Sequence, residues 1–343
     1  MKLMYEKILY CLFLGIACLF ICPTIVFSDE SAKNPIKDFS YEVVFPENQQ
    51  NKNVGYYDLL MKPGEKQTIQ LKMHNISDKP LKVAIDLNSA KTNGNGVIEY
   101  GPTDLKKDVS LNYDLAQIMT GPKEVTLKPN STEIVEFVIT LPEVAFEGYL
   151  AGGIQLKPIV KEEHSQEESI IINKFAFLIG VLIHESNTEK IKPVLKLNDV
   201  SLKLKDGSYS LFVDLSNTKG VFVEKMAAAI NIRKNNSSKN LIKFNKQDMR
   251  MAPNSAIAIP VSLQNQKITA GEYTADIRIT TADGGNWTWV KNFTFTRIEA
   301  EQINRHINQN DQSYFSGWWV LLFSTLLIIT LLLFFLRKKK RSA

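Results

Sequence analysis

The chain has 343 residues and a formal net charge of +5, but its two ends account for the positive excess. Residues 1–28 and 337–343 hold seven of the 41 basic residues and one of the 36 acidic ones, which leaves 34 basic and 35 acidic residues elsewhere. A basic surface is therefore not supported, and no nucleic-acid partner is expected. All three cysteines also lie within residues 1–28, which excludes disulfides and cysteine zinc clusters from the rest of the chain.

Residues 1–28 are typical of a secretory signal peptide. Two lysines precede an apolar run over residues 8–21, and residues 26–28 offer a cleavage site before Asp29. A lipoprotein signal is the alternative, but the residues before Cys18 and Cys22 match its small-residue box poorly. We therefore predict an exported part of about 290 residues, which is the size of two ordinary domains.

Residues 36–160 are predicted to form a first β-sandwich. Polar and apolar residues alternate over 68–73, 82–87 and 133–139, which is the period of half-buried antiparallel strands. Turn-forming stretches of Pro, Gly, Asn and Asp separate these runs. Residues 114–120 are predicted to form a short helix or an irregular turn.

Residues 161–168 are charged and lack apolar residues, so we predict a domain boundary there; a long exposed hairpin loop is the alternative. Residues 168–308 are predicted to form the second sandwich, opened by the apolar residues 170–183 as a strand pair or one long strand. Alternating runs follow at 195–204, 210–215, 228–232, 256–263, 273–280 and 287–296, with hairpin turns at Asp206-Gly207 and 282–286. Residues 299–316 are polar and indicate a short helix or a stalk. The expected fold class is all-β, with two tandem immunoglobulin-like antiparallel β-sandwiches.

Residues 317–336 form a run of 20 residues without charge or proline. As a helix this run spans about 30 Å, the thickness of the hydrocarbon core of a bilayer. Tryptophans stand at its start and the basic tail 337–343 at its end, which predicts one transmembrane helix with a cytoplasmic C-terminus. A buried core helix is the alternative. A wall-sorting signal requires Leu-Pro-x-Thr-Gly upstream, and residues 308–316 contain no such site.

No catalytic constellation is found. The four histidines are scattered, and no Gly-x-Ser-x-Gly, Ser-x-x-Lys or phosphate-binding glycine loop is present. Asp104 and Asp108 would suit a glycosidase pair or a calcium site, but their spacing is not that of an EF-hand. Gly152-Gly153 and Gly284-Gly285 are interpreted as turn or bulge glycines. We expect no catalytic residue, no metal and no cofactor.

Several motifs nevertheless occur in a distinctive order and spacing. They are Phe39-Ser-Tyr41-Glu-Val-Val-Phe-Pro46, Gly55-Tyr56-Tyr57-Asp58-Leu59, Lys62-Pro63-Gly64, Gly96-Val-Ile-Glu-Tyr100, Phe146-Glu147-Gly148, Gly152-Gly153-Ile154, residues 173–181 and residues 287–295. Together they resemble the WxL-interacting protein family of Gram-positive bacteria. The resemblance implies a signal peptide (1–28), a peptidoglycan-binding domain (36–160), a host-binding domain (168–308), a transmembrane helix (317–336) and a cytoplasmic tail (337–343).

The function that this resemblance implies is that of a membrane-anchored, non-enzymatic cell-surface adaptor. It would bind WxL-domain surface proteins and peptidoglycan, with its domains facing the cell wall. The edge strands of a sandwich are suited to take up a partner strand. An adhesin that binds host extracellular-matrix proteins through the second domain is the alternative, and a wall-modifying enzyme is disfavoured by the missing constellation.

Seven residues are candidates for ligand contact. Aromatic rings stack on sugar rings, so Tyr56, Tyr57 and Asp58 are predicted to contact glycan, and the segment Pro46-Glu47-Asn48-Gln49 is predicted as a recognition loop. The alternative is that the tyrosines pack at the edge of the sandwich, Asp58 fixes a turn and the segment is a structural loop.

Overall fold

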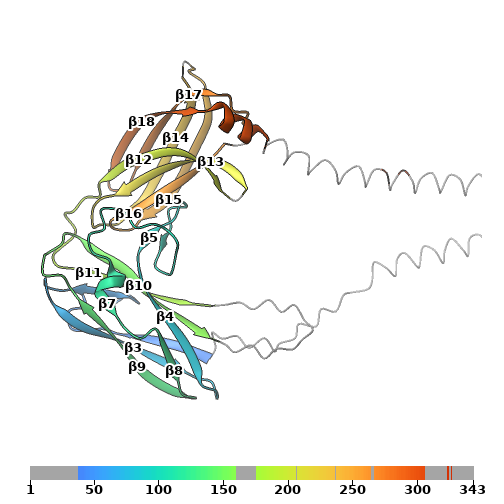
Figure 1. Ribbon diagram of the computed structural model, residues 1–343. Helices are drawn as coiled ribbons and strands as arrows, with labels where there is room; N and C mark the ends of the chain where they lie inside the picture. Colours follow the sequence, from blue (N-terminus) through green and yellow to red (C-terminus); the bar gives the residue numbers. More distant parts are fainter. Residues whose placement is uncertain are drawn as a thin grey trace, which may run out of the picture.

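The computed structural model describes residues 38–159, 175–205, 207–235, 237–263 and 266–305, together with Phe323 and Leu326. These residues form two β-sandwiches that follow one another in the chain (Figure 1), which confirms the predicted fold class. Within the described ranges, no helix is long and apolar enough to cross a membrane. The predicted signal peptide lies outside the described residues, and so does the predicted transmembrane helix apart from Phe323 and Leu326.

The first sandwich packs a four-stranded sheet against a five-stranded one. In spatial order, the first sheet contains β1 (Phe39–Val44), β3 (Lys66–Asn75), β9 (Ser131–Thr140) and β7 (Met119–Thr120). The second contains β2 (Tyr57–Leu60), β11 (Phe177–His184), β10 (Tyr149–Ile159), β4 (Leu81–Ser89) and β8 (Glu124–Leu127). Alternate residues of these strands fill one apolar core, as the period-two pattern predicts.

Strand β11 corrects the prediction that residues 170–183 open the second sandwich. It was expected to open the second sandwich, but it pairs antiparallel with β10 and parallel with β2, inside the first. Its inward residues Ile179, Val181 and Ile183 are fully buried in the first core. The segment 160–176 therefore connects β10 and β11, two neighbouring strands of one sheet. This agrees with the alternative that residues 161–168 belong to a hairpin connection and not to a domain boundary. The pairing of β2 with β11 is also a parallel exception to the predicted antiparallel pattern.

The second sandwich packs three strands against four. The three-stranded sheet contains β12 (Leu195–Lys205), β13 (Ser208–Asn217) and β16 (Ser255–Ser262). The four-stranded sheet contains β15 (Asn240–Met251), β14 (Val223–Lys234), β17 (Gly271–Thr280) and β18 (Asn286–Phe295). The helical residues 297–305 bury Ala300 and Ile303 against this core, so the helix predicted after the last strand packs on the sandwich.

One helical turn, α3 (Leu115–Ile118), follows a buried acidic cap. The carboxylate of Asp114 accepts from Ala116 N at 3.1 Å and from the Ser89 hydroxyl, and it pairs with Lys107. Burial alone would raise the pKa of Asp114, but the hydrogen bonds from Lys107, Ser89 and Ala116 N together hold it below its usual value. The ionised carboxylate therefore stabilises the first sandwich.

Replacing Asp114 with asparagine is expected to lower the free energy of unfolding by about 1–2 kcal/mol at pH 7, because the cap remains but the charge is lost. A depressed folded-state pKa gives stability that is present above the unfolded pKa and disappears as the pH falls through the folded value. Urea titrations should therefore show that the difference in unfolding free energy between the wild type and Asp114→Asn becomes smaller as the pH falls below about 5. Asp104→Asn, at an exposed position, is the control with little effect at any pH. A pH-independent loss for Asp114→Asn would contradict this account.

The two sandwiches contact each other through a hairpin of the first domain, β5 (Lys91–Thr92) and β6 (Ile98–Glu99). Thr92 Oγ1 lies 2.7 Å from Ser255 Oγ and accepts from Ala252 N at 3.0 Å. The N–H of Arg250 donates to Gly96 O at 2.8 Å, which attaches the tip of the hairpin to β15. The hairpin therefore bonds to both sheets of the second sandwich.

A second contact brings two glycines of different domains together. Gly148 has a φ of +91°, and a Cβ built there would lie 2.1 Å from the carbonyl oxygen of Gly220. The same oxygen accepts a hydrogen bond from Tyr149 N. Asp108 adds a side-chain link, because its carboxylate accepts from the hydroxyls of Ser110 and Ser216. These backbone and buried polar contacts fix the domains against each other.

Candidate functional site

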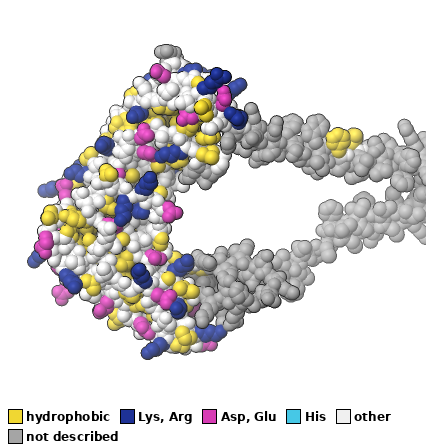
Figure 2. Space-filling model, in the orientation of Figure 1, with side chains coloured by type: hydrophobic (Ala, Val, Ile, Leu, Met, Phe, Trp, Pro, Cys, Tyr) yellow, Lys and Arg dark blue, Asp and Glu magenta, His cyan; other side chains and the backbone are white. Residues whose placement is uncertain are grey.

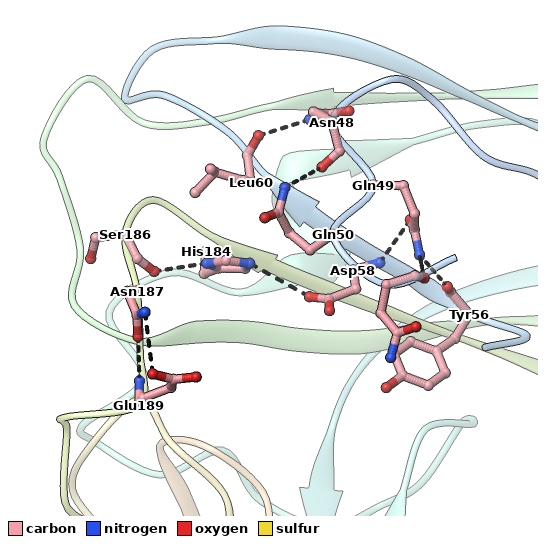
Figure 3. Close-up of polar contacts among 11 residues, drawn as sticks. Asn48, Gln49, Gln50, Tyr56, Asp58, Leu60, His184, Ser186, Asn187 and Glu189 are labelled. Carbon is pink, nitrogen blue, oxygen red and sulfur yellow. Dashed lines mark hydrogen bonds and ion pairs between the residues drawn. The ribbon is translucent and has the colours of Figure 1, made fainter. Parts of the chain in front are cut away.

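The predicted recognition loop folds back onto β2 (Figure 3). Gln49 is 5% exposed, and its Nε2 donates to Asn51 O at 2.7 Å and to Tyr56 O at 3.0 Å, while its Oε1 accepts from Asp58 N at 3.0 Å. The backbone of this segment also pairs with β2, through Gln50 N to Asp58 O at 2.8 Å and Leu60 N to Asn48 O at 3.3 Å, so the side chain of Gln49 adds to a backbone bridge.

The other residues of the segment support the same loop. Asn48 Nδ2 donates to Leu60 O, and its amide exchanges two hydrogen bonds with the amide of Gln67. Pro46 O accepts from Gln49 N at 3.2 Å, and Glu47 is exposed. Pro46, Asn48 and Gln49 thus use their polar groups within the loop, as expected if the segment is a structural loop and not a recognition loop.

Replacing Gln49 with alanine is expected to lower the free energy of unfolding by about 2–3 kcal/mol, because two carbonyls and one N–H lose their buried partner. Chemical denaturation measures this loss. Gln50→Ala is the matched control, since Gln50 is exposed and its amide makes one hydrogen bond, to Asn48 O. Equal losses for the two variants would be inconsistent with a structural role for Gln49.

Tyr57 belongs to the core and not to a ligand surface. Its side chain is 0% exposed, its hydroxyl donates to Gln70 O, and burial raises its pKa. Successive residues of a strand face opposite sides of the sheet, so Tyr56 and Asp58 lie on the outer face of the five-stranded sheet. The structure therefore separates the three predicted contact residues into one core residue and two surface residues.

Two glycines form the floor of this outer face. Gly153 of β10 and Gly180 of β11 are register partners. A Cβ at Gly153 would lie 3.0 Å from Tyr100 Cβ, and one at Gly180 would lie 3.3 Å from Tyr56 Cβ. Tyr100 and Tyr56 therefore lie side by side against the backbone of the β10–β11 pair. Gly153 is a strand residue that makes room for an aromatic side chain, which corrects its interpretation as a turn or bulge glycine.

Polar groups flank the tyrosines. Asp58 Oδ1 lies 3.5 Å from His184 Nε2 and has no hydrogen-bond partner among the described residues. His184 Nδ1 lies 2.8 Å from Ser186 O, so this nitrogen carries the hydrogen (Figure 3). The ring of Tyr149 meets the ring of His184 edge-on at 5.2 Å. Burial and then the charge of Asp58 raise the pKa of Tyr56, so the phenol stays protonated and can donate.

We call Tyr56, Asp58, Tyr100, Tyr149 and His184 the tyrosine face. It continues onto the second sandwich, where Phe222 lies 5.9 Å from the ring of Tyr149. The guanidinium of Arg250 lies 6.0 Å from the ring of Phe222 and forms two hydrogen bonds with Glu224. Three phenols, a carboxylate oxygen without a donor and an imidazole can together stack on a sugar ring and bind its hydroxyls.

Of the tyrosine face, the sequence analysis named Tyr56 and Asp58 as candidates and did not name Tyr100, Tyr149 and His184. Tyr100 follows the hairpin β5–β6, and Tyr149 and His184 are cross-strand partners of β10 and β11. The available signal was the glycine pair Gly152-Gly153, because a glycine inside a strand often marks a close approach of another group.

The structure separates the acidic residues Asp104 and Asp108, which were considered for calcium or glycoside chemistry. Asp108 is 8% exposed and bonds across the domain junction, whereas Asp104 is exposed. Across the described ranges, no group of three or more His, Asp or Glu side chains could hold a metal ion. Acidic and basic side chains are interspersed over the visible face of both domains (Figure 2), in keeping with the balanced charge of residues 29–336.

Comparison with solved structures gives distant likenesses to bacterial chaperones. A chaperone–tip adhesin complex of CFA/I fimbriae biogenesis is 12% identical, with 73% of this chain and 98% of that chain covered and a TM-score of 0.32. The E. coli chaperone DraB is 14% identical (75% and 98% covered, TM-score 0.28), and the Pseudomonas aeruginosa CupB2 chaperone is 11% identical (68% and 95% covered, TM-score 0.28). At these TM-scores the likenesses carry no argument about fold or function. No curated protein was found to match the chain.

Two family models match the chain in succession. Residues 39–158 match the WxL Interacting Protein, peptidoglycan binding domain, and residues 166–305 match the WxL Interacting Protein, host binding domain. The second match begins before β11, so it includes one strand of the first sandwich. Since both domain models occur in order over most of its length, the chain belongs to the WxL Interacting Protein family.

Proposed function

We propose that this chain is a non-enzymatic adaptor of the cell surface that binds peptidoglycan and holds WxL-domain proteins there. The names of the two matched domains support binding to peptidoglycan and to a host component. The observation that carries the peptidoglycan part is the tyrosine face, where Tyr56 and Tyr100 lie side by side over Gly153 and Gly180.

The chemistry of this face suits a glycan. The C–H face of a sugar ring packs on aromatic rings, and its hydroxyls need partners that remain available. Asp58 Oδ1 has no hydrogen-bond partner among the described residues and is closed to solvent, so a sugar hydroxyl can pair with it once the side chain turns outward. Asp58 lies on the same side of the sheet as Tyr56.

The topology that we propose follows from the ends of the chain. A signal peptide at residues 1–28 directs export, and a helix at residues 317–336 stays in the membrane with the basic tail 337–343 in the cytoplasm. The two sandwiches then face the cell wall and are tethered to the membrane instead of being linked covalently to the wall.

A second candidate function is adhesion to host extracellular-matrix proteins through the second sandwich. The match of residues 166–305 to a host binding domain favours it. Titrating the full chain against purified matrix proteins measures it, and a flat response would remove it.

The adaptor proposal is tested with the full chain in detergent. Sedimentation with purified sacculi and capture by an immobilised WxL-domain protein should each saturate. If neither does, the adaptor proposal is wrong. The same incubations report on the enzyme alternative, since release of soluble muropeptides would indicate catalysis.

A further inference from the structure

Strand β18 is a long edge strand of the second sandwich, and β12 of the facing sheet lies near it. It pairs with β17 over all 10 of its residues in an unbroken register and is the last strand of its sheet. Thr281 N donates to Gly285 O at the start of this ladder. Thr281 and Gly285 are thus a hydrogen-bonded pair, and in an antiparallel ladder every second pair is hydrogen-bonded. The odd-numbered residues of β18 therefore bond to β17, and the N–H and C=O groups of Thr288, Val290 and Asn292 point away from it.

The other edges of the second sandwich carry features that prevent strand addition. Strand β15 pairs with three register shifts and carries Lys243, Lys246 and Arg250. Strand β12 has a bulge between Leu197 and Asp199, and β16 contains Pro260. In contrast, β18 has no proline and no bulge, and its outward residues are Asn286, Thr288, Val290, Asn292 and Thr294. Bulges, prolines and charges, including charges that point inward, are the usual protection of an edge, and Lys291 on the inward row is the one such feature of β18.

The inward row of β18 indicates what an added strand would contain. Trp287, Trp289 and Phe293 are half-buried at the margin of the second core. Lys291 stands in the same row between Trp289 and Phe293, half-buried and without an ion pair among the described residues. A half-buried cation in an apolar row is stabilised by a carboxylate beside it.

We propose that β18 binds an extended segment of a separate partner protein by strand addition. The segment places apolar side chains beside Trp289 and Phe293, and an acidic side chain between them pairs with Lys291. This inference gives a location to the partner binding in the proposed function and rests on it, but it is independent of the peptidoglycan site on the first sandwich.

A second copy of the chain fits this edge poorly. In an antiparallel β18–β18 pair with aligned faces and full overlap, the two Lys291 side chains lie directly opposite or diagonally adjacent. Like charges in these positions destabilise a pair of strands. The charge on the inward row therefore favours an acidic partner over self-association.

The test uses the full chain and a blocked nine-residue peptide with valine at the inward positions, threonine at the outward ones and glutamate at the central inward one. A second peptide has lysine at the centre. The wild type should bind the glutamate peptide at least tenfold more tightly than the lysine peptide. Val290→Pro removes an outward N–H without breaking the ladder with β17, and it should weaken binding at least tenfold relative to Val290→Ala. Lys291→Glu should reverse the preference between the two peptides.

Each other outcome contradicts the proposal. Equal binding by Val290→Pro and Val290→Ala, or an unchanged preference in Lys291→Glu, would place the peptide elsewhere. If the wild type is a dimer that Val290→Pro converts to monomers, the edge belongs to a second copy. Failure of peptide binding while the WxL-domain protein is still captured would overturn the location and leave the adaptor function standing.

Discussion

Replacing Gly148 with alanine is expected to lower the free energy of unfolding by about 2–5 kcal/mol and to loosen the contact between the sandwiches. Two costs add in this variant. A φ of +91° is strained for a residue with a side chain, at about 1–3 kcal/mol, and the new Cβ would lie 2.1 Å from Gly220 O. The carbonyl oxygen of Gly220 belongs to the backbone and cannot rotate away as a side chain would, so the two domains must move apart to relieve the contact. Denaturant unfolding measures the loss.

The chain offers a matched control for this variant. Gly284 also has a φ of +91°, but a Cβ there would meet nothing within 4 Å, so Gly284→Ala isolates the backbone strain. The excess loss in Gly148→Ala is the contribution of the domain contact. Loosening should also speed tryptic cleavage after Lys190, between β11 and β12. Equal effects of the two substitutions on stability and cleavage would mean that the domains do not hold each other through this contact.

The double substitution of Tyr56 and Tyr100 with alanine is expected to weaken binding to purified sacculi at least tenfold. The two rings provide the stacking surface on the β10–β11 pair, and large aromatic contacts carry much of the energy of such sites. Sedimentation isotherms of the full chain give the change in affinity. The stability of the variant should fall only modestly, because both side chains are half-buried on the outer face.

The matched control keeps the rings and removes the hydroxyls. Tyr56→Phe with Tyr100→Phe should retain most of the binding if stacking dominates, and thermal unfolding should confirm that both double variants are folded. Unchanged binding by the folded alanine variant would contradict the assignment of the glycan site to the tyrosine face.

The strands could be predicted from sequence wherever one face is buried. Residues 68–73 alternate strictly between polar and apolar, and they lie in a strand with alternating burial. Strand β15 was missed because its pairing with β14 is shifted by bulges, so its buried residues change parity between Ile242 and Met249. A pattern with a constant period of two cannot register such a change.

The sequence pattern does not predict the domain to which a strand belongs. The apolar residues of β11 suit either core, and only their pairing with β10 and β2 assigns them to the first. The candidate site likewise combines residues that local geometry predicts with residues that only the tertiary fold brings together. The alternation of Tyr56, Tyr57 and Asp58 across a sheet follows from local geometry, whereas Tyr100, Tyr149 and His184 reach the same face through contacts between distant segments.

The most direct measurement is hydrogen exchange of the full chain with and without soluble peptidoglycan fragments. The account predicts protection in the segments that carry the tyrosine face, at residues 54–60, 98–102, 149–155 and 178–185, and no change along β18. Protection confined to the second sandwich, or no protection at concentrations where sacculi bind, would contradict it.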